Sequence, residues 1–160
     1  MTFSKELLDQ LAEDPIAVLN RGYRAQQRIA LRQERIISWR QIAESITANP
    51  ENSSGGGGPS NKIERCVLAI VSLEEEITDE ITQMAAYESE SSKIIEAFVP
   101  DHNYATVLEL RYLSHDRWEQ IAVKMGYTFR WTQELHRRAI DLLQENVRQY
   151  CDECVATLPK

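Results

Sequence analysis

Residues 118–143 read WEQIAVKMGYTFRWTQELHRRAIDLL, and this stretch decides the predicted fold. In its first part apolar residues recur three and four positions apart, which predicts a short amphipathic helix over residues 116–125 with Asp116 as its N-terminal cap. Gly126 interrupts that spacing, and glycine readily adopts the left-handed backbone conformation that tight turns require. The sequence therefore predicts a short helix that ends in a glycine turn.

A second helix is predicted to begin at Phe129, because Thr128 stands where a hydroxyl would cap it. The residues expected to face inward are Leu135, Ala139 and Leu142. The residues expected to face outward are polar, and they are Arg130, Gln133, Glu134, Arg137 and Arg138. A helix, a glycine turn and a helix with a polar outer face are the pattern of a helix-turn-helix, whose second helix enters the DNA major groove.

The order WEQIA, three residues, Gly, Tyr and Thr, followed by a helix bearing Arg and Gln, resembles region four of bacterial sigma factors. It is most similar to the helix-turn-helix of phage and prophage regulators of the ArpU and RinA type. An LRY helix usually precedes the motif in that family, as Leu110, Arg111 and Tyr112 do here. The resemblance covers residues 104–143, about a quarter of the chain. It implies a three-helix DNA-binding module with host RNA polymerase as a partner.

The resemblance also implies that Phe129, Arg130, Gln133 and Glu134 are the base-reading positions. Arginine can donate two hydrogen bonds to guanine, glutamine can pair with adenine, and glutamate can accept from cytosine. The chain departs from the family at Phe129 and Trp131, where charged or polar residues are common. We expect Trp131 to cover the core rather than to contact DNA.

The candidate DNA-binding residues extend from the polar face of the second helix to the flanks of the motif. They are Thr128, Phe129, Arg130, Gln133, Glu134, Arg137, Arg138, Arg117 and Lys124. Arg117, Lys124 and Arg111 are expected to contact phosphates, which positions a protein on DNA without reading its sequence. For every one of these side chains, the alternative is an ordinary solvated helix surface.

The composition is that of an ordinary soluble globular protein, with 42% hydrophobic and 27% charged residues in a chain of 160. This length suits one domain, or a small domain with an extension, and is enough to bury a core. No stretch approaches the ~18 uncharged apolar residues of a membrane span, and the first residues lack the apolar run of a signal peptide. We therefore expect a cytoplasmic protein without a membrane partner.

The net charge of −7 is unevenly distributed along the chain. Residues 16–49 contain six arginines and two glutamates, residues 62–101 contain three basic and ten acidic residues, and residues 104–149 contain seven basic and six acidic residues. The acidity is concentrated in the middle segment, so it does not exclude DNA contact elsewhere. It predicts modest DNA affinity for a single copy, and we therefore expect a homo-oligomer.

Two helices are predicted before the glycine-rich stretch. Ser4 caps a short one, and Pro15 opens a long one that runs to about Ala48. The apolar seam of the long helix consists of Ala25, Ile29, Ile36, Trp39, Ala43 and Ile46, with Arg32 interrupting it. Residues 49–61 read NPENSSGGGGPSN, which predicts a flexible loop because these residues cannot bury apolar surface. The loop has neither the lysine nor the preceding strand of a phosphate-binding loop.

A second long helix is predicted from about residue 60, with an apolar seam that repeats every ~3.5 residues. This seam comprises Ile63, Val67, Ile70, Leu73, Ile77, Ile81 and Met84. Because this helix is acidic and the preceding one is basic, we expect the two to pair as an antiparallel hairpin. The arginines from Arg21 to Arg40 then face the acidic helix, and the alternative for them is a second track of phosphate contacts.

The predicted organisation is an all-α fold in two domains. Residues 1–101 are expected to form a helical hairpin or bundle, and residues 102–160 a sigma-like helix-turn-helix domain.

Metal binding and catalysis have little support in the sequence. Cys151 and Cys154 form a single CxxC, and a structural zinc site would also need Cys66 and one of the three histidines to converge on them. The run SHD at residues 114–116 cannot form a catalytic triad, because residues adjacent in sequence do not face one another as a triad does. We therefore expect no metal, no cofactor and no enzymatic activity.

These patterns and the resemblance together predict a phage or prophage transcriptional regulator that binds promoter DNA through residues 129–140. Two alternatives stay open. One is a phage small terminase subunit, which also joins a helix-turn-helix to a helical oligomerisation region. The other is an interaction adaptor whose acidic helix binds a protein and whose helix-turn-helix is only structural.

Overall fold

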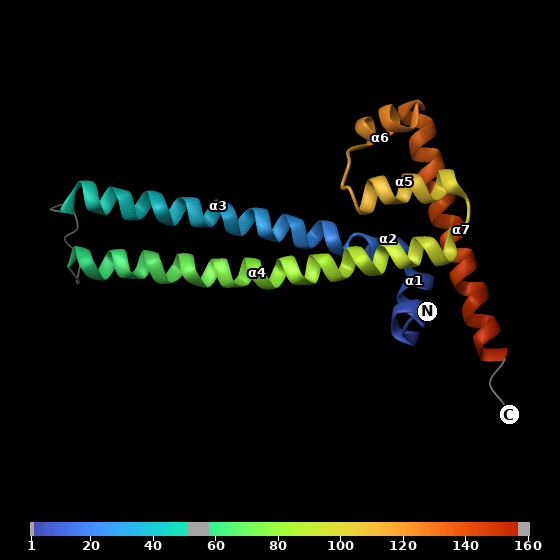
Figure 1. Cartoon of the computed structure of the whole chain (residues 1–160), viewed down its shortest axis with the longest axis horizontal. Helices are drawn as coiled ribbons and strands as arrows, with labels where there is room; N and C mark the ends of the chain where they lie inside the picture. The colour runs from blue at the N-terminus through green and yellow to red at the C-terminus, as the bar shows by residue number, and fades with distance from the viewer. Residues whose placement is uncertain (1, 51–57, 157–160) are drawn as a thin grey trace. The chain divides into compact units, whose positions relative to one another are not determined.

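The computed structural model describes residues 2–50 and 58–156, and in this part of the chain every regular element is a helix (Figure 1). The helices are α1 (Lys5–Glu13), α2 (Pro15–Leu19), α3 (Arg21–Ala48), α4 (Pro59–Phe98), α5 (His102–Tyr112), α6 (Trp118–Met125) and α7 (Phe129–Ala156). The predicted all-α class is confirmed. Most of the predicted loop at 49–61 lies outside the described residues. None of the described helices is both long and apolar enough to cross a membrane.

Side-chain caps determine where the first two helices begin. The backbone N–H of Leu7 donates to Ser4 Oγ at 3.3 Å, so the predicted cap of α1 is confirmed. Asp14 caps α2 in the same way, since the N–H of Ala17 donates to its Oδ1 at 3.0 Å. Pro15 occupies the first position of α2, where a missing N–H costs nothing.

The single long helix predicted from Pro15 is wrong at its beginning, because α2 ends at Leu19 and α3 starts only at Arg21. The break allows Val18 and Leu19 to be buried in the hydrophobic core. The Nε of Arg21 donates to the carbonyl of Val18 at 3.0 Å. In a continuous helix that carbonyl would accept from a backbone N–H one turn later, so the arginine side chain replaces the lost helical bond.

The chain divides into two compact units, Met1–Tyr23 with Ala85–Lys160, which we call the core unit, and Arg24–Met84, which we call the long-helix unit. This division differs from the predicted boundary after residue 101. The reason is that the C-terminal part of α4 shares one hydrophobic core with α1, α5 and α7. That core includes Leu8, Leu11, Ile94, Ile95, Phe98, Val107, Leu108, Leu135, Ala139 and Leu143.

Within the core unit, α7 satisfies the C-terminal ends of α1 and α4. The Nε2 of Gln144 donates to the carbonyl of Ala12 at 2.8 Å, and Arg148 donates to the same oxygen at 3.0 Å. The Nδ2 of Asn146 donates to the carbonyl of Phe98 at 2.7 Å. The last carbonyls of a helix have no partner within that helix. These three side chains therefore fix α1 and α4 on α7 through bonds as well as through apolar contact.

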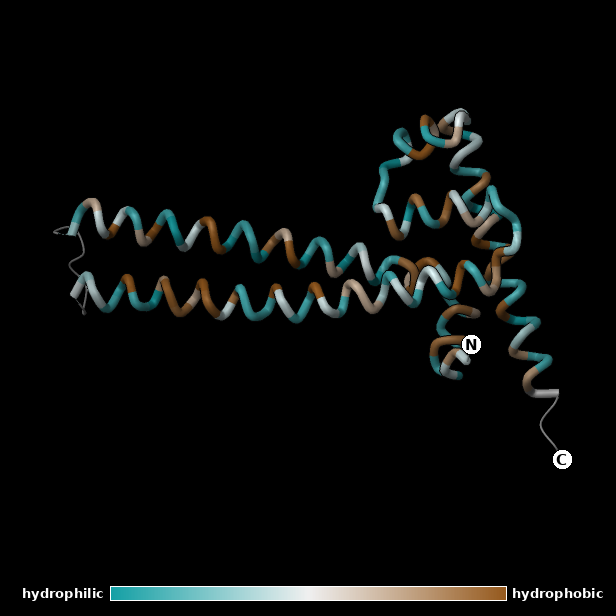
Figure 2. The backbone as a smooth tube through the Cα atoms, viewed as in Figure 1, coloured by the Kyte–Doolittle hydropathy of each residue, from teal (hydrophilic) through white to brown (hydrophobic). Residues whose placement is uncertain are grey.

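In the long-helix unit, α3 and α4 pack along an apolar seam, and hydrophobic and hydrophilic positions alternate along both helices (Figure 2). Ala25 and Ile36 of α3 are buried as predicted. On α4, Val67 and Ile81 are 50% and 48% exposed, so their predicted place in the seam is wrong, and Cys66 is buried instead. Adjacent residues of a helix point ~100° apart, and the spacing of apolar residues did not decide whether Cys66 or Val67 is the buried one.

Ion pairs of the long-helix unit join α3 to α4 in antiparallel order. The pairs are Arg28–Glu80, Arg32–Glu76 and Arg40–Glu74, with N–O distances of 2.8, 2.7 and 3.8 Å. In the core unit Arg21 pairs with Glu90. The prediction that the arginines from Arg21 to Arg40 face the acidic helix is confirmed for these four and not for Arg24 and Arg35, which are exposed and have no ion pair among the described residues. The side chains of Glu80 and Arg32 are 13% and 22% exposed, whereas both partners of the Arg40–Glu74 pair are more than half exposed, so that pair contributes only ~0–1 kcal/mol.

Candidate nucleic-acid interface

The helix α6 begins at Trp118, and the predicted capping role of Asp116 is wrong. The backbone N–H of Arg117 donates to the side-chain oxygen of Gln120 at 2.9 Å, so a glutamine inside the helix satisfies its N-terminus. Asp116 lies 2.6 Å from Nζ of Lys124 instead. Asp116 stands one residue before the N-cap, which is Arg117, and its carboxylate pairs with the ammonium in the last turn of α6.

The turn between α6 and α7 has the predicted chemistry. Gly126 has a φ of +71°, in the left-handed region, and ends α6. The Oγ1 of Thr128 accepts a hydrogen bond from the N–H of Trp131 at 3.2 Å. The predicted glycine turn, the threonine cap and the start of α7 at Phe129 are confirmed.

The inward face of α7 includes Leu135 and Ala139, as predicted, but Leu142 is only half-buried. Ile140 and Leu143 are the buried residues at this level of the helix. The reason is that α7 packs on α5 and α6 near its beginning and on α1 further along. Its buried face therefore widens beyond the single predicted stripe.

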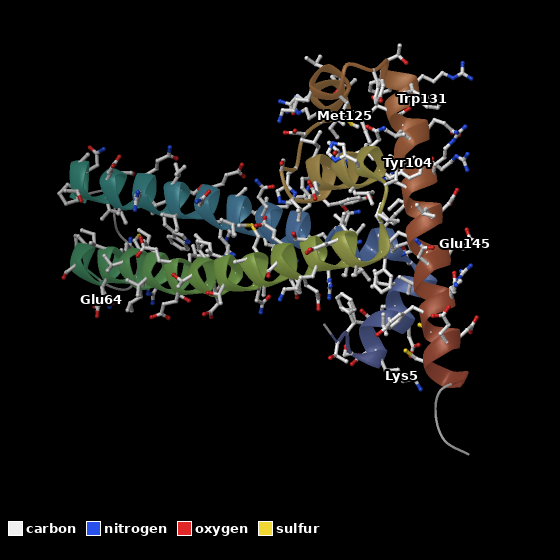
Figure 3. All side chains as sticks on the ribbon, turned by 45° about the vertical axis from the view of Figure 1, so that its right-hand side comes forward. Lys5, Glu64, Tyr104, Met125, Trp131 and Glu145 are labelled. Carbon is white, nitrogen blue, oxygen red and sulfur yellow. The ribbon has the colours of Figure 1, made fainter. Side chains whose placement is uncertain are left out.

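The prediction that Trp131 covers the core is wrong, because its side chain is 41% exposed near the beginning of α7 (Figure 3). Phe129 is 44% exposed. Thr132 is the fully buried residue of this turn, and its hydroxyl donates to the carbonyl of Thr128 at 2.9 Å. The guanidinium of Arg138 lies 5.2 Å from the centre of the Trp131 ring, so a cation–π contact covers part of the exposed indole.

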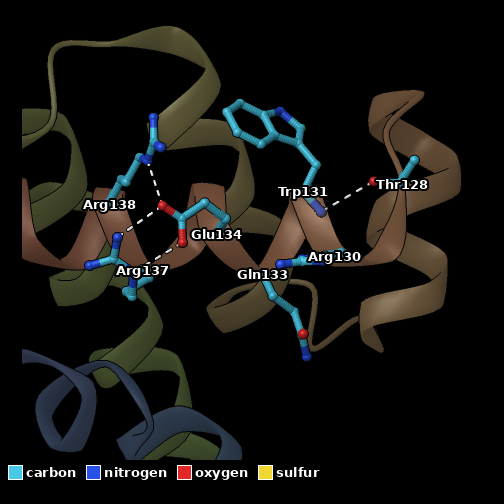
Figure 4. A pocket seen from close by; sticks show the side chains of 7 residues that line it. All are labelled: Thr128, Arg130, Trp131, Gln133, Glu134, Arg137 and Arg138. Atoms are coloured by element: carbon cyan, nitrogen blue, oxygen red, sulfur yellow. Dashed lines mark hydrogen bonds and ion pairs between the residues drawn. The ribbon is translucent and has the colours of Figure 1, made fainter.

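Glu134 binds two arginines of the outward face of α7 (Figure 4). Arg137 donates to both carboxylate oxygens, at 2.8 and 3.1 Å, and Arg138 donates to one of them at 2.8 Å. Hydrogen bonds from Arg137, and then from Arg138, lower the pKa of Glu134 to about 2. Arg137 also lies 3.0 Å from Asp141. The i,i+3 and i,i+4 spacing of these residues is a sequence signal for such pairs that the prediction of a base-reading Glu134 did not use.

Arg130 and Gln133 differ from this cluster. Both side chains are exposed, and neither has a hydrogen-bond or ion-pair partner among the described residues. They share with the arginines and Glu134 an open hollow of about 640 Å³, lined by Thr128, Arg130, Trp131, Gln133, Glu134, Arg137 and Arg138. Six of these seven lining residues are predicted DNA-binding residues, the exception being Trp131. The structure therefore brings the predicted polar face together on one surface.

The flanking cations have different surroundings. Arg117 is exposed, and no carboxylate in the described part of the chain forms an ion pair with it. Lys124 is paired with Asp116. Arg111 lies over the ring of Trp118 at 4.5 Å and donates to the carbonyl of Asp116 at 3.0 Å. Arg111 thus stabilises the α5–α6 turn, and Arg117 is the flanking cation most accessible to a phosphate.

A buried polar pair supports α7 from α5. The hydroxyl of Tyr112 lies 2.8 Å from Nε2 of His136, whose ring is 4.9 Å from that of Trp118. Burial, and then the charge of Arg111, lower the pKa of His136 to about 4, and burial raises the pKa of Tyr112 to about 12. The only role predicted for His136 from the sequence is that of a possible metal ligand. Its contact with the tyrosine of the LRY helix depends on a separation of 24 residues and has no local signal.

His115 connects the α5–α6 turn to α4. Its φ of +56° is unusual for a residue other than glycine. Its Nε2 lies 3.1 Å from Oε1 of Glu88, its ring lies 5.8 Å from that of Tyr23, and its side chain is 9% exposed. The side chains of the SHD run thus have separate partners, since His115 meets Glu88 and Asp116 meets Lys124.

The cysteines are divided between the two units. Cys66 belongs to the long-helix unit, and Cys151 and Cys154 belong to the core unit. Within residues 2–50 and 58–156, no three His, Cys, Asp or Glu side chains are grouped as the ligands of a metal ion. The CxxC motif is a part of the helix α7.

Comparison of the chain with protein-family models, with curated proteins and with solved structures gave no match.

Proposed function

We propose that the chain binds double-stranded DNA, with α5, α6 and α7 as a helix-turn-helix module and the first turns of α7 in the major groove. The observation that carries this proposal is the pair Arg130 and Gln133. Both side chains follow the Gly126 turn and the Thr128 cap, both are exposed, and neither has a partner among the described residues. A guanidinium and an amide can each make two hydrogen bonds to a base edge in the major groove.

A second argument for the proposal is the packing of α7 against the rest of the core unit. Thr132, Leu135 and Ala139 are buried on its inner side. The pair Tyr112–His136 connects it to α5. A recognition helix needs a rigid support, because base contacts depend on positions within fractions of an ångström. Exposed Arg117 at the start of α6 adds a phosphate contact that would fix the register of the module on the duplex.

A role as a phage or prophage transcriptional regulator that acts with host RNA polymerase is the finer form of the proposal. It rests on the resemblance of residues 104–143 to the sigma-like helix-turn-helix. The net charge of −7 and the pairing of Arg137, Arg138 and Lys124 with carboxylates leave few cations for phosphates. Tight binding therefore requires a second copy of the chain or a protein partner.

The test is selection of bound sequences from a random DNA pool, followed by binding of the selected duplex to the double variant Arg130→Ala/Gln133→Ala. We expect the parent to prefer the selected duplex over a scrambled one and the variant to lose that preference. Two lost base contacts at ~1–3 kcal/mol each would lower the discrimination at least tenfold. Far-ultraviolet circular dichroism should show unchanged helix content.

The chain offers a matched control in Arg24→Ala/Gln27→Ala. These residues have the same types and the same spacing, and both are exposed on α3 in the long-helix unit. This control should keep the parent's preference. A double variant at Arg130 and Gln133 that binds as the parent does would show the recognition-helix assignment to be wrong. Absence of salt-sensitive DNA binding even at low ionic strength would favour the interaction adaptor, and a ring-like oligomer would favour the terminase subunit.

A further inference from the structure

We propose that Glu134 restrains DNA binding by holding Arg137 and Arg138 in ion pairs that a DNA phosphate must displace. The proposal rests on the proposed DNA binding through α7. It assigns Glu134 to the control of affinity, in addition to any contact with a base.

The geometry shows how completely one carboxylate engages the two guanidinium groups. Arg137 forms a two-bond fork with Glu134, at 2.8 and 3.1 Å, and its remaining terminal nitrogen lies 3.0 Å from Asp141. Arg138 bonds the same Glu134 carboxylate at 2.8 Å, and its guanidinium lies over the ring of Trp131. A carboxylate and a phosphate present similar pairs of oxygens to arginine. Glu134 therefore occupies the position beside the two guanidinium groups that a DNA phosphate would take.

The charges of the cluster cancel. Two arginines, Glu134 and Asp141 sum to zero, so this part of α7 attracts a polyanion weakly as long as the pairs persist. A phosphate that approaches Arg137 or Arg138 also meets the negative charge of Glu134. Since all four side chains are at least 32% exposed, the pairs are screened by water and can exchange with a stronger anion.

The restraint on phosphate contacts acts on random and on preferred DNA alike. Binding to random DNA depends almost entirely on phosphate contacts, so the restraint acts on it in full. On a preferred site, Arg130 and Gln133 add base contacts that need no ion pair to break, because neither is paired among the described residues. Glu134 therefore lowers the affinity for both kinds of DNA, while the base contacts of Arg130 and Gln133 discriminate between them as before.

The test uses the full chain and the isosteric variant Glu134→Gln, which removes the charge and keeps the size of the side chain. Binding to a random-sequence duplex is followed by fluorescence anisotropy at several salt concentrations. We expect Glu134→Gln to bind random DNA roughly five- to tenfold more tightly at low salt, with a salt dependence steeper by about one phosphate contact. The affinity for a selected site should rise by a similar factor, because its phosphate contacts are released in the same way.

Two matched controls remove the same single charge from α7. Asp141→Asn releases only one bond of Arg137 and should give a smaller gain than Glu134→Gln. Glu145→Gln changes an exposed glutamate further along the helix and should give the smallest gain. Thermal unfolding of all variants by circular dichroism checks that the fold is retained.

Each outcome has a definite meaning. An equal gain in affinity for random DNA in Glu134→Gln and Glu145→Gln would show that only the net charge matters, and it would overturn the proposal. Parent binding that is unchanged or weakened by Glu134→Gln would also overturn it, while leaving the proposed DNA binding intact. Absence of salt-sensitive binding by the parent and by all variants would overturn the proposed function, and this proposal with it.

Discussion

The hydroxyl of Tyr112 lies 2.8 Å from Nε2 of His136, and this bond joins α5 to α7 within the core unit. Neither residue is on the exposed face of α7, yet both support the helix that carries it. The pair is therefore the place where the stability of the module can be changed without touching Arg130 or Gln133.

Acid should destabilise the protein through His136. Its pKa is about 4 in the folded chain, below the ordinary value of 6.5, because burial disfavours the charged ring. As the pH falls, the unfolded chain therefore binds a proton at this histidine before the folded chain does. The contribution of the neutral ring to the free energy of unfolding is fully present above pH 6.5 and is lost between pH 6.5 and 4. The loss should reach up to about 2 kcal/mol by pH 5.

Urea unfolding at pH 7 and pH 5 would measure this effect, with His136→Gln as the variant and exposed His102→Gln as the control. The pH dependence in this window should shrink in His136→Gln and persist in His102→Gln. An unchanged dependence in both variants would assign the effect to other groups.

Tyr112→Phe should lower the free energy of unfolding by about 1 kcal/mol, because it leaves the buried His136 nitrogen without its partner. Tyr127→Phe is the matched control, since Tyr127 is 38% exposed and loses little with its hydroxyl. Thermal unfolding compares the two. Equal changes in Tm would show that the Tyr112–His136 bond contributes nothing to stability.

Gly126→Ala should destabilise the protein by about 1 kcal/mol through backbone strain alone. A Cβ at Gly126 would meet no atom within 4 Å, so no steric clash adds to the cost of its φ of +71°. Gly126→Asn should cost less, because asparagine tolerates the left-handed region. Gly58→Ala, at a glycine without a positive φ, should be nearly neutral. Denaturant unfolding of the three variants should give this order, and an equally neutral Gly126→Ala would show that the turn can relax.

His115→Ala and Glu88→Ala should each destabilise the core unit, and the double variant should cost less than the sum. The two side chains share one bond of 3.1 Å, and removal of either partner already breaks it. A coupling energy of about 1 kcal/mol is expected from a double-mutant cycle. Strict additivity would mean that the α5–α6 turn is not held to α4 by this pair.

Local chemistry made part of the structure predictable. The left-handed Gly126, the caps at Ser4 and Thr128 and the start of α7 follow from residues within one helical turn of each other. The predictions fail where residues are buried by contacts with parts of the chain that are distant in sequence. The break before Arg21 arises because Val18 and Leu19 enter a core formed with the C-terminal helices, and no local spacing indicates it.

The sequence predicted which residues form the candidate site, but not how their side chains pair with one another. Its polar residues do share one surface of α7. Arg130 and Gln133 have no partner among the described residues, whereas Arg137 and Arg138 are paired with Glu134. Spacing could have indicated this cluster, whereas the contacts of His136 and His115 join residues 24 and 27 positions apart and required the fold.

The bond from Gln144 to the carbonyl of Ala12 spans 132 positions of the chain, and this separation has a consequence for the order of folding during synthesis. A ribosome adds ~5–20 residues per second, so α1 is made on the order of ten seconds before the side chain that completes it. A nine-residue helix is marginal in water by itself. The helix α1 therefore becomes stable only after α7 has emerged, so it is made before α7 but is among the last of these elements to fold.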